Sequence, residues 1–309
     1  AGLNPDAITV AEEWGDARDY LDRTGFHSTM NYHALAIPLD AFAFDGRIDA
    51  TTFADEVTSR FDAFPEATRP ALMNILAGHD TDRLASMIVN GRLGGHFDRL
   101  AGPRDTTAYL VRAPNDDERD LQRAVVLLQM ALPGAPLVYY GDEAGMWGAD
   151  DPDDRKPMVW PDLVYADESL APRGLTRDPD PVAFDRDLFA FYRRAIALRQ
   201  SDAVLRRGTL QTLAAEGRAV AFGRTLDGDR RVVAFNAGDA SVFLPMPGEG
   251  VPEPLVPVSV SRDDAARVAM LVAQFDDEGA TYGLRIPPRT TVVFRPADPA
   301  DIRPRGLDE

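Results

Sequence analysis

Short apolar runs alternate with amphipathic segments over the first two thirds of the chain. Strand-like apolar runs occupy residues 8–11, 26–32, 72–76 and 135–140, and apolar residues recur at helical spacing in 52–64, 117–132 and 182–200. An alternation of buried strands and helices is typical of a parallel sheet with right-handed crossovers. We therefore predict an α/β fold for residues 1–202.

Polar residues follow each of the predicted strands. They are Glu12, Asn31, the pair His79 and Asp80, and the pair Asp142 and Glu143. Parallel α/β folds collect their chemistry at the carboxyl ends of their strands. The sequence therefore predicts a functional site along this edge of the sheet.

The pattern changes after residue 201. Short β-like segments follow one another there, separated by Gly, Pro and Asp. We predict that residues 203–296 form an antiparallel β-sandwich domain. Residues 297–309 are rich in Pro and Asp, and we expect them to be a loose tail.

Composition removes several classes of function. Fifty acidic and 33 basic residues give a net charge of −17, and such a surface repels nucleic acid and anionic membranes. No run approaches the ~20 apolar residues of a membrane-spanning helix. The absence of cysteine excludes disulfides, thiolate nucleophiles and Cys-ligated metals, and it leaves the compartment open.

The basic residues are almost all arginine, since Lys156 is the only lysine. Excess surface acid keeps a protein soluble at high salt. A GC-rich genome, which favours Arg, Asp and Ala codons, explains the composition equally well.

Glu12 and Asp80 are candidates for a catalytic pair. Two carboxylates must flank a glycosidic bond that is cut by acid and nucleophile catalysis, and both residues end predicted strands. His79 can donate a hydrogen bond to a sugar hydroxyl. From spacing alone, a structural or metal-binding role explains these residues at least as well.

Four motifs resemble those of one enzyme family. Residues 10–14 (VAEEW) and 74–83 (NILAGHDTDR) resemble the strand-five and strand-seven motifs of the alpha-amylase family of retaining glycoside hydrolases. Residues 133–160 and the run MNYH at 30–33 resemble strands eight and six of its neopullulanase, cyclomaltodextrinase and maltogenic amylase branch. The resemblance runs from about residue 7 to residue 201. It implies the second half of a (β/α)8 TIM barrel followed by that family's C-terminal β domain.

The resemblance also implies roles for residues at the strand ends. Glu12 would be the general acid/base, in a partly buried apolar setting that raises its pKa. Asp80 would stabilise the oxocarbenium-like transition state with the help of His79, and Trp14 would stack on a sugar ring. Glu13 is the rival acid, but strand alternation lets only one of the two glutamates face a cleft. Plain core packing is the alternative for Trp14.

A second set of residues lies in the strand-eight region. The resemblance implies that Asp151 and Arg155 hold a glucose unit on the non-reducing side of the cut. A loop ion pair is the alternative. The acidic run 150–154 also suggests a calcium loop, although it lacks the spacing and glycine of an EF-hand. We expect no required cofactor, with calcium left open.

The chain departs from the family at the nucleophile. The family's nucleophile is the Asp of an Arg-x-Asp motif that belongs upstream of residue 7, and its Asp-x-x-x-x-Asn-His motif is also missing. Residues 47–49 have the spelling Arg-Ile-Asp but precede a predicted helix. We expect a missing segment, a second chain or a self-associated copy to supply the first half of the barrel, since half a barrel leaves two strand edges unpaired.

These observations lead to one expected function and two alternatives. We expect a retaining hydrolase of α-1,4 bonds in maltodextrins, cyclodextrins or pullulan, with its nucleophile outside these 309 residues and little activity without it. The alternatives are an inactive partial barrel that binds α-glucan weakly, and an α-glucan transglycosylase. Members of the branch occur in the cytoplasm and in the periplasm, so the compartment stays open.

Overall fold

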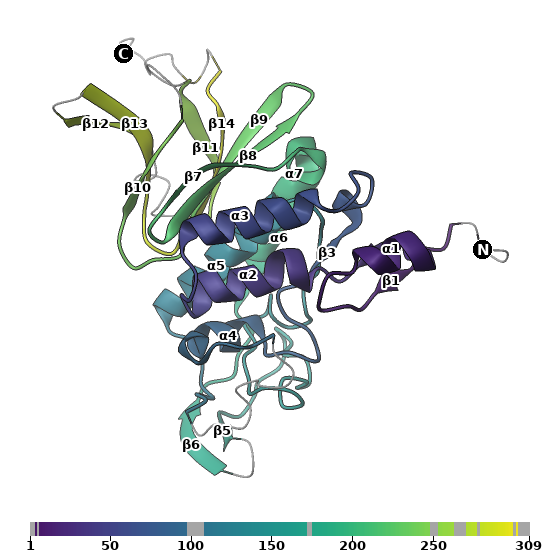
Figure 1. Cartoon of the computed structure of the whole chain (residues 1–309). Coiled ribbons are helices and arrows are strands. Elements are labelled where there is room, and N and C mark those ends of the chain that lie inside the picture. The colour runs from purple at the N-terminus through teal and green to yellow at the C-terminus, as the bar shows by residue number, and fades with distance from the viewer. Residues whose placement is uncertain are drawn as a thin grey trace.

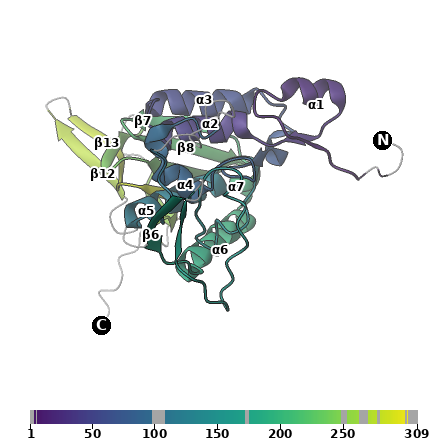
Figure 2. The ribbon, with the colours of Figure 1, turned by 90° about the horizontal axis from the view of Figure 1, so that it is seen from below.

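The computed structural model describes residues 4, 6–97, 108–171, 175–247, 253–262, 270–276, 279–298 and 301. Helices α2 (Ile37–Leu39), α3 (Ala50–Asp62) and α5 (Asp116–Ala131) lie beside a group of β-strands formed by the last third of the chain (Figure 1). The segment with β1 (Val10–Ala11) and α1 (Arg18–Thr24) projects from the opposite side of this body, as both views show (Figures 1 and 2).

Four short parallel strands follow the order of the sequence. β1 pairs with β2 (Ser28–Thr29), and β3 (Met73–Asn74) pairs with β4 (Ala135–Pro136). A parallel bridge between Met30 and Met73 connects the two pairs. The predicted parallel arrangement is present, and in the described part of the chain the outer edges of β1 and β4 have no strand partner.

The strands are shorter than the apolar runs predicted, with two residues each. Ile8, which was predicted to lie in a buried strand, is 75% exposed. The prediction of a strand over residues 26–32 is wrong at its end, because Tyr32 starts a π-helical turn (Tyr32–Ala36). The Asn31 side chain accepts a hydrogen bond from the Ala34 amide at 3.1 Å and so caps this turn.

The three predicted helices are present as α3, α5 and α6 (Arg186–Ser201). Helix α5 begins in a capping box, in which Asn115 accepts from the Glu118 amide and the Glu118 carboxylate accepts from the Asn115 amide. Besides α1 and α2, the short helices are α4 (Leu84–Val89) and α7 (Ala203–Arg207).

The last third of the chain forms two antiparallel sheets. One has the order β11-β14-β9-β8-β7 and the other β10-β13-β12. Strand β10 contacts β7 and β8, and β12 and β13 contact β11, β14 and β9, so the two sheets pack against each other. The bounds are β7 (Gln211–Glu216), β8 (Ala219–Leu226), β9 (Asp229–Asn236), β10 (Val242–Pro245), β11 (Leu255–Val260), β12 (Met270–Asp276), β13 (Gly279–Ile286) and β14 (Thr290–Pro296). A separate hairpin of β5 (Glu168–Ala171) and β6 (Leu175–Asp180) precedes α6.

One hydrophobic core joins the helices to the larger sheet. Phe53 of α3 and Val125 of α5 belong to the same buried cluster as Phe222 of β8 and Phe235 of β9. The packing is therefore continuous across residue 202, where the sequence pattern changes.

Two buried arginines reinforce this junction. Arg199 donates to the carbonyls of Met130 and Leu132 at 2.8 Å each, and Arg224 donates to the carbonyl of Ala131. These carbonyls end helix α5, where a cation also complements the helix dipole. Burial lowers the pKa of Arg224 to about 9 and that of Arg199 to about 10.

Two further predictions concern membrane-spanning helices and the C-terminal tail. In the part of the chain that the structure describes, no helix is both long and apolar enough to span a bilayer. Within the predicted loose tail, Asp301 pairs with Arg295 at 2.7 Å, and residues 299, 300 and 302–309 lie outside the described part.

Candidate active site

Glu12 directly follows β1, at the carboxyl end of the parallel strands. The predicted partly buried setting is wrong for this side chain, since Glu12 is exposed; β1 has only β2 beside it among the described strands. The neighbouring Glu13 is half-buried, and its carboxylate accepts a hydrogen bond from the Gly15 amide at 2.9 Å. Glu13 therefore shapes the turn after β1.

Asp80 and His79 lie in the loop after β3. The Thr81 hydroxyl accepts from the Gly78 amide at 2.8 Å and closes this loop into a tight turn. Asp80 is half-buried and His79 is exposed, and the His79 Nε2 lies 3.5 Å from the Asp80 Oδ1.

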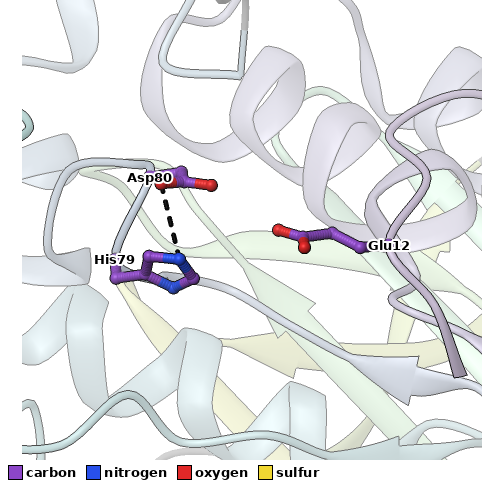
Figure 3. Close-up of side chains that lie close together, drawn as sticks. All are labelled: Glu12, His79 and Asp80. Atoms are coloured by element: carbon purple, nitrogen blue, oxygen red, sulfur yellow. Dashed lines mark ion pairs between the residues drawn. The ribbon is translucent and has the colours of Figure 1, made fainter.

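The structure brings these three residues together. One ligand atom from each of Glu12, His79 and Asp80 lies within 4.8 Å of the other two. Figure 3 shows the Glu12 carboxylate pointing toward Asp80 and His79 from a different segment of the chain. Two carboxylates at this distance can act on the same bound group, and the same three donors could also hold a divalent cation.

Arg155 joins Asp80 to the strand-eight loop. Its guanidinium lies 3.3 Å from Asp80 and 2.5 Å from Asp151, and its Nε donates to the His79 carbonyl at 2.8 Å. The loop ion pair that was the alternative for Asp151 and Arg155 is therefore present. It lies against the same Asp80 that faces Glu12.

Trp14 is packed against aromatic neighbours. Its ring stacks on Tyr32 with centroids 4.4 Å apart and an interplanar angle of 11°, and the Phe97 ring meets it edge-on at 6.2 Å. The side chain is half-buried. Tyr32 covers one face, which leaves at most the other for a sugar.

The acidic run 150–154 does not gather a donor set. Within the described residues, Glu12, His79 and Asp80 form the one group of three or more potential metal donors.

Sequence reasoning missed Arg83, a buried residue that links the loop after β3 to the segments around Tyr140 and Asp154. Its Nε donates to the Asp154 carbonyl at 2.9 Å and its Nη1 to the Tyr140 carbonyl at 2.7 Å. The guanidinium lies 4.7 and 4.8 Å from the ring centroids of Tyr139 and Tyr140. The position of Arg83 three residues after Asp80 was visible in the sequence, but its partners are backbone carbonyls and aromatic rings that no local pattern marks.

A buried carboxyl completes this network. Asp142 lies 3.3 Å from the Arg83 Nη1. Burial raises the pKa of Asp142 to about 7, although the Arg83 charge opposes that shift.

Short parallel strands, helical crossovers and paired carboxylates at the strand ends define a class of α/β enzyme with its site on the carboxyl edge. Comparison with known families makes this specific. Residues 2–208 match the family described as "Alpha amylase, catalytic domain". The chain therefore belongs to the alpha-amylase family of glycoside hydrolases, which confirms the resemblance seen in the motifs.

Curated relatives belong to the expected branch. The chain is 35% identical over 252 residues to Neopullulanase 2 of Thermoactinomyces vulgaris, with 80% of this chain and 35% of that protein covered. It is 31% identical over 243 residues to a cyclomaltodextrinase of a Bacillus species, with 78% and 35% covered. The chain thus spans about a third of the length of these relatives.

Solved structures agree on the fold. A structure titled "Cyclomaltodextrinase" matches 94% of this chain and 41% of its own length, at 27% identity and a TM-score of 0.63.

Proposed function

We propose that this chain forms part of a retaining α-glucan hydrolase that cuts α-1,4 bonds in maltodextrins, cyclodextrins or pullulan. The observation that carries the proposal is the convergence of Glu12, His79 and Asp80 to within 4.8 Å. Family membership and the names of the relatives support the choice of an α-glucan as substrate.

In this mechanism Glu12 protonates the leaving oxygen and then deprotonates the incoming water. Asp80 binds sugar hydroxyls and holds them more tightly as positive charge develops, with His79 donating to a hydroxyl. Because Glu12 is exposed, we propose that the bound substrate or the protein segment that covers the site shields its carboxyl group from water.

The nucleophile is proposed to come from outside these residues. Residues 47–49 are not a substitute, since the Asp49 side chain accepts from the Thr52 amide at 2.8 Å and caps α3. We propose that β1 to β4 are the second half of an eight-stranded barrel. The first half, from another segment or a second copy, would cover the outer edges of β1 and β4, which are unpaired among the described strands.

Asp151 and Arg155 are proposed to bind a glucose unit next to the scissile bond, and Trp14 to offer its remaining face to a ring. A guanidinium paired with a carboxylate suits vicinal hydroxyls. We also propose that no resident cofactor is needed. Excess chelator should then leave turnover unchanged, and a loss restored by calcium would contradict this.

The unpaired edges favour one second candidate, a partial barrel that binds α-glucan without cutting it. Reducing-sugar release from cyclodextrin separates the two. The longer protein, with the upstream sequence, should be active and the 309-residue chain should not. Transglycosylation would appear as longer maltodextrin products when the products of the same reaction are separated by chromatography.

The acid assignment is tested with Glu12→Gln in the active protein. We expect turnover to fall by about 10²- to 10⁴-fold, the range that general acid–base groups contribute. Glu13→Gln is the matched control, because Glu13 holds a turn, and it should stay close to wild type. Wild-type turnover in Glu12→Gln would refute the mechanism.

A further inference from the structure

The only lysine of the chain is bound to the β5–β6 hairpin. The Lys156 Nζ donates to both carboxylate oxygens of Glu168, the first residue of β5, at 2.6 Å each. The same ammonium group lies 4.6 Å from the ring centroid of Trp147, which is buried. Glu168 and Trp147 therefore hold the Lys156 ammonium group in position.

The hairpin is itself anchored to the body of the protein. Arg177 of β6 lies 4.8 Å from the Trp147 ring centroid and donates to Asp180 at 2.8 Å. Asp180 also accepts from the Ala113 amide at 3.0 Å, just before α5. Glu168 thus offers Lys156 a carboxylate on a firmly held element.

Lys156 is the chain neighbour of Arg155. The two side chains extend to different partners, since Arg155 contacts Asp80 and Asp151 while Lys156 contacts Glu168. The Lys156 carbonyl also accepts from the Tyr140 hydroxyl at 2.6 Å. Anchoring Lys156 therefore restricts the backbone from which Arg155 reaches Asp80.

Electrostatics favour a tight pair here. Burial lowers the pKa of Lys156, and the Glu168 carboxylate opposes that shift. A partly desolvated ammonium held by both oxygens of a carboxylate is a stronger contact than an exposed surface pair. Removing the Glu168 charge would leave Lys156 poorly compensated.

We propose that Lys156 and Glu168 are positioning residues, whose ion pair holds Arg155 in place on Asp80 for sugar binding. This inference rests on the proposed function, because it acts through Arg155. It assigns the β5–β6 hairpin a role in substrate affinity that acts through Arg155.

The test measures kcat and KM for short maltodextrins in the active protein. We expect Glu168→Gln to raise KM about 3- to 10-fold and to change kcat less than about 2-fold, since Arg155 would be displaced while the acid stays in place. Lys156→Arg keeps a cation that can reach Glu168 and Trp147, so it should stay within about 2-fold of the wild-type KM.

A double-mutant cycle shows whether the effect passes through Arg155. Arg155→Ala should raise KM, and adding Glu168→Gln to it should raise KM no further. Glu253→Gln is the matched control, because Glu253 forms an exposed pair with Arg230 in the β region. Melting temperatures establish that each variant is folded. Glu168→Gln removes the charge of the ion pair and Lys156→Arg keeps it, so the two variants test the pair from either side.

Three outcomes are distinguishable. If Arg155→Ala raises KM and Glu168→Gln does not, the positioning role is wrong while the proposed function stands. Additive effects of the two changes would equally overturn it, since the pair would then act independently of Arg155. If Arg155→Ala leaves KM unchanged, its sugar-binding role and this inference both fail, while Glu12→Gln still tests the hydrolase separately.

Discussion

Asp40 is a buried carboxylic acid that makes stability depend on pH. It is 1% exposed and lies 3.6 Å from the Arg47 guanidinium. Burial raises its pKa to about 6, while His96 acts in the opposite direction. Its proton is therefore bound more tightly in the folded protein than in the unfolded chain.

The direction of the pH dependence of stability follows from the difference between the pKa of Asp40 in the folded and in the unfolded chain. The stability that this raised pKa contributes is fully present below about pH 4 and is lost as the pH rises through about 6. Relative to Asp40→Asn, the wild type should lose about 2 kcal/mol of unfolding free energy between pH 4 and pH 7. Denaturant titrations at both pH values measure this difference. Asp55→Asn, at an exposed position of α3, is the control and should show no such trend; equal pH dependence in wild type and Asp40→Asn would contradict the assignment.

The sequence could predict which residues meet better than how they are held. Glu12 and Asp80 both follow parallel strands, so their proximity could be expected from topology. The roles of Arg83 and Lys156 could not, because their partners are carbonyls, aromatic rings and a hairpin carboxylate that only the folded chain brings near. No local pattern marks such contacts.

At the scale of elements, helix periodicity was a better guide than strand pattern. The ends of α5 differ by one residue from the predicted 117–132, because a capping box and an apolar stripe are both local signals. A strand's length depends on neighbouring strands. The runs 8–11 and 135–140 therefore form only two-residue strands in β1 and β4, each of which has a single strand partner in the described part.

The junction between α5 and the larger sheet should depend on Arg224. Its guanidinium donates to the carbonyls of Thr209 and Gly208, at 2.8 and 2.9 Å, as well as to Ala131. Arg224→Met leaves several buried carbonyls without a donor, so we expect a loss of about 3 kcal/mol or more in unfolding free energy. Arg230→Met, at an exposed position of the neighbouring strand, should change it by less than about 0.5 kcal/mol. Similar losses in the two variants would show that the buried bonds do not stabilise the junction.

At the scale of the molecule, the shared core predicts cooperative unfolding. Phe53 and Phe222 pack edge to face with centroids 6.2 Å apart, so the helices and the larger sheet bury each other's apolar surface. Thermal unfolding followed by far-ultraviolet circular dichroism and by tryptophan fluorescence should give a single coincident transition. A chain ending at residue 202 should lose that transition. Two separate transitions in the intact chain would show that the parts fold independently.

The cations around Trp147 have a spectroscopic consequence. The chain has three tryptophans: Trp147 lies within 5 Å of Lys156 and Arg177, Trp14 stacks on Tyr32 two positions after Glu12, and Trp160 is exposed. Their emission should therefore differ in wavelength and in quenching. Single-tryptophan variants would give one optical reporter for the hairpin anchor and another for the candidate site beside Glu12, so that loosening of the anchor and arrival of the proposed sugar ligand could be followed as separate signals in real time.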